Sequence, residues 1–166
     1  MEIYLMRHGK AEAICEDGDP ARSLTPAGEE SIIGIGRALA GMGISFDVIF
    51  ASTLARAMQT GKLIGAQTNP GLTPVPSSEL AYGEDLGRVL NLLREYPQAS
   101  RALFVGHQPR IERWIGELVS TVGDVSLRVG TGCIGCIEIF SIPPREPGVL
   151  NWFCNSAQLD SLIQGP

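Results

Sequence analysis

The stretch MEIYLMRHG (residues 1–9) opens the chain and indicates how the rest of it folds. Its first part is a short, mostly apolar run, which is typical of a buried β-strand. The run ends abruptly in an arginine, a histidine and a glycine. The chain has only 2 histidines, His8 in this stretch and His107 much later, so the surroundings of both need an explanation.

The composition of the chain is that of an ordinary soluble protein. Its 166 residues suffice for one domain with a sizeable core, and we expect a single domain over residues 1–166. A net charge of −5, with lysines and arginines scattered, argues against nucleic acid as a partner. No apolar stretch reaches membrane-spanning length, and the first residues lack the pattern of a signal peptide. We therefore expect a cytoplasmic protein with no membrane partner.

Apolar runs of strand type alternate with helical patterns along most of the chain. Helices are predicted at residues 26–42, 53–67, 84–96 and 109–120, and strands at 2–6, 46–52, around 75, 101–106, 125–130, 133–142 and 149–153. The first helix has the clearest start, because Thr25 can cap it and Pro26 suits its first position. This order predicts a three-layer α/β/α sandwich with a mostly parallel central sheet flanked by helices and antiparallel strands toward the C-terminus.

Polar residues of one chemical kind follow three of the predicted strands. Arg7 and His8 end the first, Arg56 comes within a helical turn of the second, and His107 ends the strand at 101–106. Ligands of open α/β sheets bind beyond the carboxyl ends of the strands, so these four residues are expected at one rim.

Two guanidinium groups and two imidazoles at one rim suit a phosphoryl group. Guanidinium groups bind phosphate oxygens bidentately, and a neutral imidazole can attack phosphorus. The surrounding cations stabilise negative charge in the transition state. This chemistry needs no metal and no cofactor, and the sequence offers no obvious carboxylate cluster for a metal ion.

Three segments, LMRHG, ASTLARAMQT and LFVGHQP, resemble the histidine phosphatase (phosphoglycerate mutase-like, RHG) superfamily in the family's order. The chain also resembles the SixA-like phosphohistidine phosphatases of this superfamily, in its short length and in the segments RHGKAE, SLTPAGEE and LNWF. The resemblance implies that His8 is the nucleophile, oriented with the help of Gly9. It implies that Arg7, His8, Arg56 and His107 bind the phosphate. Ser52 and Thr60 match the same segments and are expected to support the pocket.

The proton donor is the least defined part of the predicted site. Many members of the superfamily use an acidic residue after the second helix, and SELAYGED supplies Glu79 there. A surface carboxylate without a catalytic role is an equally good interpretation of Glu79. The N–P bond of phosphohistidine is weak, and its imidazole leaving group needs less help from an acid than an alkoxide does.

The expected substrate is a phosphohistidine on a signalling or phosphotransfer protein, with small phosphorylated molecules as the next choice. A mutase is the alternative within enzymes, although this chain has little spare length for the segment that covers a mutase site. A non-catalytic module that binds phosphate or a phosphoprotein is the alternative of another class.

Two further motifs are expected to be structural. Cys133 and Cys136 form a lone CxxC before an apolar strand, and we interpret them as buried free thiols rather than as a zinc or redox site. GTGCIG (residues 130–135) matches a dinucleotide-binding fingerprint, but a strand and not a helix follows it. We therefore predict a glycine-rich turn or bulge there.

Overall fold

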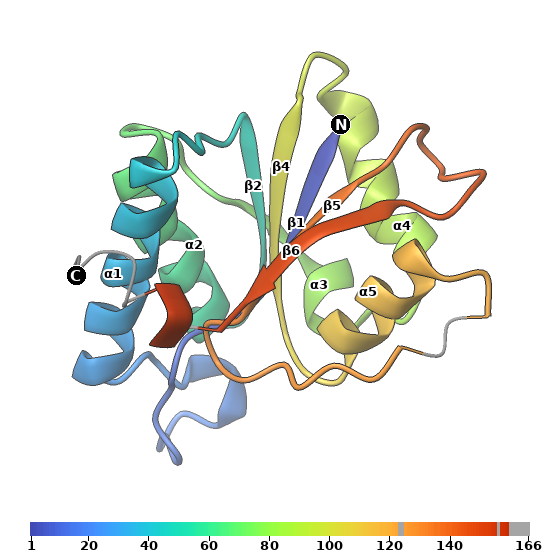
Figure 1. Ribbon diagram of the computed structural model, residues 1–166. Helices are drawn as coiled ribbons and strands as arrows, with labels where there is room; N and C mark the ends of the chain where they lie inside the picture. The colour runs from blue at the N-terminus through green and yellow to red at the C-terminus, as the bar shows by residue number, and fades with distance from the viewer. Residues whose placement is uncertain (123–124, 156, 160–166) are drawn as a thin grey trace.

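A six-stranded sheet lies between two layers of helices in the computed structural model, which describes residues 1–122, 125–155 and 157–159 (Figure 1). The order of the strands across the sheet is β3-β2-β4-β1-β5-β6. The first four are parallel, whereas β5 runs antiparallel to β1 and β6 antiparallel to β5. In chain order they are β1 (Glu2–Arg7), β2 (Val48–Ser52), β3 (Val75–Ser77), β4 (Arg101–Gly106), β5 (Ile134–Glu138) and β6 (Val149–Cys154). The predicted fold class is confirmed.

The helices divide between the two faces of the sheet. One face is covered by α1 (Pro26–Gly41) and α2 (Ala55–Thr68). The other is covered by α3 (Ser78–Tyr82), α4 (Leu86–Asn91) and α5 (Arg110–Val119). Short 3₁₀ helices, η1 (Asp19–Ala21) and η2 (Leu92–Glu95), complete the list. No helix among the described residues has the length and apolar character that a membrane span needs.

Alternation along β1 explains why both faces of the sheet are apolar. Ile3 and Leu5 point into the core under α3–α5, while Tyr4 and Met6 point into the core under α1 and α2. All four are essentially inaccessible to solvent. Successive strand residues face opposite sides, so a central strand with a helical layer on each side must be apolar throughout.

The predicted start of α1 is confirmed and fixes the chain just after the RHG triplet. Thr25 Oγ1 accepts a hydrogen bond from the backbone N–H of Gly28 at 3.1 Å, and Pro26 follows as the first helical residue. A Cβ on Gly28 would lie 2.1 Å from the carbonyl oxygen of Lys10. The same carbonyl accepts from the N–H of Thr25 at 2.9 Å. The helix start therefore pins the chain two residues after His8.

One predicted strand is wrong. Residues 125–130, which alternate like a strand, form no strand in the parts that the structure describes. They run past the end of β1, where the carbonyl oxygen of Val129 accepts a hydrogen bond from Arg7 at 2.9 Å. Val129 is buried against the core under α5, so its hydrophobic character serves packing and not a sheet ladder. The predicted glycine-rich turn is confirmed at Gly132, whose φ of 76° suits glycine.

Candidate active site

The two histidines lie side by side where the chain leaves β1 and β4. These strands are neighbours, and Arg7 is opposite Gly106 in their register. From β1 the chain passes to α1 on one face of the sheet, and from β4 it passes to α5 on the other. Connections that depart to opposite faces leave a crevice between adjacent strand ends, which is where open α/β sheets bind ligands. The centroids of the His8 and His107 rings are 4.9 Å apart in this crevice.

The ring of His8 is held by the backbone, with one nitrogen left for chemistry. Its Nδ1 lies 2.7 Å from the carbonyl oxygen of Gly9. A carbonyl only accepts, so Nδ1 carries the proton and Nε2 keeps its lone pair. Burial lowers the pKa of His8 to about 4, although the bond to Gly9 opposes the shift. The charges of Arg56, Arg7 and Arg22 lower it further. His8 is therefore a neutral imidazole near neutral pH.

Thr60 connects the glycine beside His8 to α2. Its Oγ1 accepts a hydrogen bond from the N–H of Gly9 at 3.1 Å and donates to the carbonyl oxygen of Arg56 at 2.7 Å. Thr60 is completely buried. The expected support of the pocket by Thr60 thus takes the form of a bridge between the end of β1 and the first turn of α2.

His107 is oriented by Ser52, the last residue of β2. The Nε2 atom of His107 lies 2.7 Å from Ser52 Oγ, which already accepts from the N–H of Leu54 at 3.2 Å. The Ser52 proton is then available for Nε2, and this arrangement favours a proton on Nδ1 of His107. That Nδ1 is buried without a partner. Burial lowers the pKa of His107 to about 3, and neighbouring His8 adds to the shift.

The two predicted arginines, Arg7 and Arg56, reach the same crevice from different elements. Arg56 lies in the first turn of α2 with its side chain only 7% exposed. Arg7 ends β1, and burial lowers its pKa. In both guanidinium groups the Nε–H is buried without a hydrogen-bond partner.

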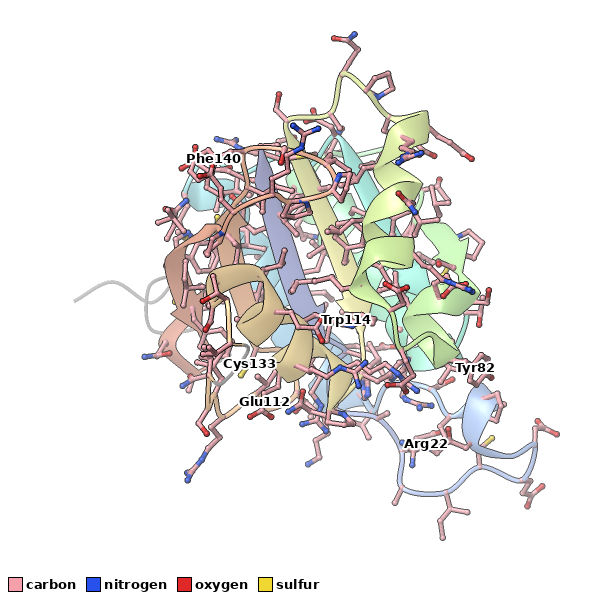
Figure 2. The ribbon with its side chains drawn as sticks, turned by 90° about the vertical axis from the view of Figure 1, so that its right-hand side faces the viewer. Arg22, Tyr82, Glu112, Trp114, Cys133 and Phe140 are labelled. Carbon is pink, nitrogen blue, oxygen red and sulfur yellow. The ribbon has the colours of Figure 1, made fainter. Side chains whose placement is uncertain are left out.

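Unpartnered buried donors are rare in folded proteins and mark places where a partner belongs. The described residues contain five such side-chain atoms, and four are nitrogens of Arg7, Arg22, Arg56 and His107. The fifth, the indole nitrogen of Trp114, lies in the core under α5 (Figure 2). A cluster of unpartnered N–H groups around a neutral imidazole is suited to an oxyanion.

Two residues of this region, Asp19 and Arg22, were missed by the sequence analysis. Both lie in the β1–α1 connection, within which Arg22 donates a hydrogen bond to the carbonyl oxygen of Ala13 at 3.3 Å (Figure 2). Asp19 Oδ2 is 3.1 Å from Arg56, and its Oδ1 is 3.3 Å from Nε of Arg22, without hydrogen-bond geometry at the second contact. The loop is rich in Asp, Gly and Pro and has no periodicity, so nothing local distinguished these two charges from solvated ones.

Glu79, the predicted candidate for the proton donor, lies in α3. Its carboxylate is 3.9 Å from Arg88 of α4. Within the described parts of the chain, no hydrogen bond or ion pair links it to the four predicted phosphate-binding residues. A donor role for Glu79 stays a prediction.

The CxxC cysteines are separated by the sheet. Cys133 belongs to the core under α5, and Cys136 to the core under α1 and α2. Both are buried free thiols, as predicted, and burial raises the pKa of each. No group of three or more potential metal-ligating side chains occurs among residues 1–122, 125–155 and 157–159.

The model of the family described as "Histidine phosphatase superfamily (branch 1)" matches residues 3–130, which include all four predicted phosphate-binding residues. The chain belongs to the histidine phosphatase superfamily. One relative is an uncharacterised protein of Picosynechococcus sp., 35% identical over 119 residues, or 69% of this chain and 70% of that protein. Another is a 2,3-bisphosphoglycerate-dependent phosphoglycerate mutase of Rhizobium etli, 34% identical over 56% of this chain and 48% of the mutase.

Solved structures extend the likeness of the fold to nearly the whole chain. The protein histidine phosphatase SixA in complex with tungstate has a TM-score of 0.84 and 23% identity, covering 96% of this chain and 99% of that one. A structure from Nakamurella multipartitia, provisionally identified as a phosphohistidine phosphatase SixA, has a TM-score of 0.77 and 26% identity over 93% and 95%. The α-ribazole phosphatase of Shigella flexneri has a TM-score of 0.71 and 20% identity over 94% and 97%. This histidine phosphatase is thus SixA-like in its fold.

Proposed function

We propose that this histidine phosphatase removes phosphoryl groups from phosphohistidine on proteins, through an intermediate in which His8 carries the phosphoryl group. The observation on which the proposal depends is the arrangement of the two imidazoles. His8 is neutral and has a free Nε2, and the ring of His107 lies 4.9 Å away with an unpartnered Nδ1. Such a pair can attack a phosphoryl group and donate a hydrogen bond to one of its oxygens.

In the first step, Nε2 of His8 attacks phosphorus in line with the leaving group. A new N–P bond forms while the bond to the leaving nitrogen breaks, and the leaving imidazole takes a proton from water or from Glu79. Arg7, Arg56 and His107 donate hydrogen bonds to the phosphoryl oxygens, where negative charge lies in the transition state. Their N–H groups are already fixed by the fold, so little reorganisation is needed when the substrate binds.

In the second step, water attacks the phosphorus of phospho-His8. The N–P bond breaks, its electron pair returns to Nε2, and phosphate leaves while the proton lost by water passes to solvent. The hydrogen bond from Nδ1 to Gly9 persists through both steps, so the ring stays in position. No metal ion or cofactor takes part in either step.

The leaving group is the reason for preferring phosphohistidine. An imidazole leaves from phosphorus with less protonation than an alkoxide, so a site without a well-placed acid suits N–P bonds. Glu79 is engaged with Arg88 in α4, which fits a minor role for an acid. The likeness to SixA with tungstate, a tetrahedral oxyanion like phosphate, supports both the pocket and the substrate class.

Hydrolysis of small phosphate esters is the second candidate. It is favoured by the likeness to an α-ribazole phosphatase and by the relative that is a phosphoglycerate mutase. The two candidate functions differ in the leaving group of the substrate. An experiment can vary this group while the phosphoryl group that is transferred stays the same.

The test compares kcat/KM for a phosphohistidine peptide, a phosphoserine peptide of the same sequence and an aryl phosphate. We expect the phosphohistidine peptide to react fastest and the phosphoserine peptide slowest, because the alkoxide leaves least readily. Brief incubation with radiolabelled substrate, followed by alkaline quenching, is expected to leave an acid-labile label on the protein. A faster reaction of the phosphoserine peptide would favour the second candidate, and binding of phosphate without any turnover would favour a non-catalytic module.

A further inference from the structure

The connection between β1 and α1 places one exposed carboxylate, that of Asp19, against the buried guanidinium of Arg56. The side chain of Arg56 is 7% exposed and that of Asp19 61% exposed, so this ion pair runs from the buried pocket to the surface. Arg56 donates one hydrogen bond to the backbone carbonyl of Asp19 at 2.8 Å and another to its carboxylate at 3.1 Å. The Nε–H of Arg56 remains unpartnered and available to a phosphoryl oxygen.

The net positive charge around His8 equals in size the negative charge of one phosphoryl dianion. Three guanidinium groups, those of Arg7, Arg22 and Arg56, each lower the pKa of His8 and therefore lie close enough to affect it. Asp19 raises the pKa of the neighbouring His107, whereas Arg110 lowers it, and Arg110 is itself paired with Glu84 at 3.1 Å. With both imidazoles neutral and Arg110 balanced by Glu84, three positive charges and one negative charge remain, and a phosphoryl dianion cancels the difference.

The position of Asp19 determines which part of a substrate it meets. His8 is buried, and in-line attack places the leaving group on the side of phosphorus opposite its Nε2, which is the side from which a substrate enters. The 61% exposed carboxylate of Asp19 lies on the solvent side of the buried Arg56 guanidinium. A leaving group with a second negative charge would face this carboxylate, and its natural partners, Arg56 and Arg22, are already paired with Asp19.

We propose that Asp19 is a specificity-determining residue, which selects phosphoryl groups on uncharged leaving groups and disfavours substrates with a second anion beside the phosphorus. The inference deepens the proposed function, on which it rests. Phosphohistidine fits it, because imidazole carries no negative charge. Phosphoglycerates and bisphosphates do not fit, because a carboxylate or a second phosphate lies next to the reacting group.

The test uses two aryl phosphates, phenyl phosphate and 3-carboxyphenyl phosphate, whose leaving phenols have nearly the same acidity. In Asp19→Asn the amide oxygen can still accept from Arg56, while the negative charge is lost. We expect kcat/KM for the carboxylated substrate, relative to phenyl phosphate, to rise about fivefold, the effect of one partly screened charge at short range. The gain is expected to shrink at high salt. Asp17→Asn is the matched control, since it removes an exposed charge from the same loop.

An equal loss of kcat/KM for both substrates in Asp19→Asn would overturn the inference, because Asp19 would then only hold Arg56 in place. An equal change of the ratio in Asp17→Asn would also overturn it, because net charge rather than position would be responsible. Turnover by the wild-type protein shows whether the role of Asp19 or the proposed function itself has failed. If it hydrolyses neither aryl phosphate nor the phosphohistidine peptide, the proposed function fails, whereas turnover with an unaltered ratio in Asp19→Asn contradicts only the role of Asp19.

Discussion

The two ends of the central sheet differ in the polarity of the side chains that gather there. Polar side chains are buried at the end of the sheet where β1, β2, β3 and β4 terminate. Apart from Thr68, all buried polar residues among those described lie there, namely His8, Ser52, Arg56, Thr60, Ser77 and His107. At the other end, near Phe140 in Figure 2, a groove of about 290 Å³ is lined mainly by apolar residues, including Met1, Leu93, Tyr96 and Ile142.

The comparison shows what parallel strands contribute to this site. Each parallel strand delivers its last residues to the same edge, and the segments that follow β1, β2 and β4 together supply one pocket. Among the described residues, no side chain of the antiparallel strands β5 and β6 hydrogen-bonds to the residues of this pocket. Instead, β5 pairs with β1 and β6 pairs with β5, and the turn before β5 donates the N–H of Gly132 to the carbonyl oxygens of Arg7 and His8, both at 3.1 Å. We therefore expect substitutions at the first edge to change activity and those elsewhere to change stability.

The largest expected effect is that of His8→Ala. His107, the other histidine of the chain, has its Nε2 against Ser52, so turnover of the phosphohistidine peptide should fall by about 10⁴-fold or more without His8. Steady-state kinetics and the loss of the acid-labile label measure it. Phe140→Ala, a change at the apolar end, is the control and is expected to leave turnover unaltered. Retention of the label in His8→Ala would place the covalent step on another residue.

Arg56→Ala should weaken the binding of phosphate and vanadate while the fold persists. Loss of a hydrogen bond from a charged group to an anion costs about 1.5–3 kcal/mol, which corresponds to an inhibition constant about 10- to 100-fold higher. Inhibition by vanadate measures the effect, and circular dichroism checks the fold. Arg88→Ala is the matched control, because that side chain is 70% exposed on α4. Equal inhibition constants for the two variants would remove Arg56 from the phosphate site.

The pKa values of the two histidines should lie well below that of an exposed histidine. We expect His8 to titrate near pH 4 and His107 near pH 3 in the phosphate-free protein. The neutral rings are favoured in the folded state, so the free energy of unfolding should decrease as the pH falls from 6.5 toward these values. NMR of the imidazole nitrogens measures both titrations, and His8→Ala assigns the signals.

The variant His8→Ala also tests whether the two histidines influence each other's pKa. His8 lowers the pKa of His107, so the pKa of His107 should rise when His8 is replaced by alanine. Titration of either ring near pH 6.5 in the free protein would show that the pocket is more hydrated than the structure implies.

Glu79→Gln should have a smaller effect that depends on the leaving group. If Glu79 donates a proton, kcat for the phosphoserine peptide should fall by about 10²-fold, the usual contribution of a general acid, and kcat for the phosphohistidine peptide much less. If Glu79 only pairs with Arg88, both substrates should react as with the wild type. An equal fall for both peptides would contradict the leaving-group argument.

Cys136→Ala should have the smallest effect on function. Its thiol lies in the core under α1 and α2, so we expect unaltered kcat/KM and a free energy of unfolding lower by about 1 kcal/mol. Thermal denaturation and steady-state kinetics measure the two quantities. The thiols of Cys133 and Cys136 should both stay free in the wild-type protein under a mild oxidant, because they are buried and the sheet separates them. Loss of activity on oxidation would revive a redox role for the CxxC.

The amino-acid sequence by itself determined the order of the strands in the parallel half, although not the short helix α3, and it predicted that four candidate site residues follow the ends of these strands. Apolar runs ending in RHG, AS and VGH identify strands with chemistry at their ends, because a buried strand has to be apolar and its end is the first place where polar residues can follow. Local rules also predicted the Thr25 cap of α1 and the glycine-rich turn at Gly132.

Only the tertiary structure decided which distant groups meet in the pocket. Asp19 reaches Arg56 across 37 residues, and the carbonyl of Val129 reaches Arg7 across 122. Both contacts come from loops, whose course depends on what they pack against and not on any period in their residues. Residues 125–130 show the same limit, since their strand-like alternation reflects burial against α5 without a neighbouring strand to pair with.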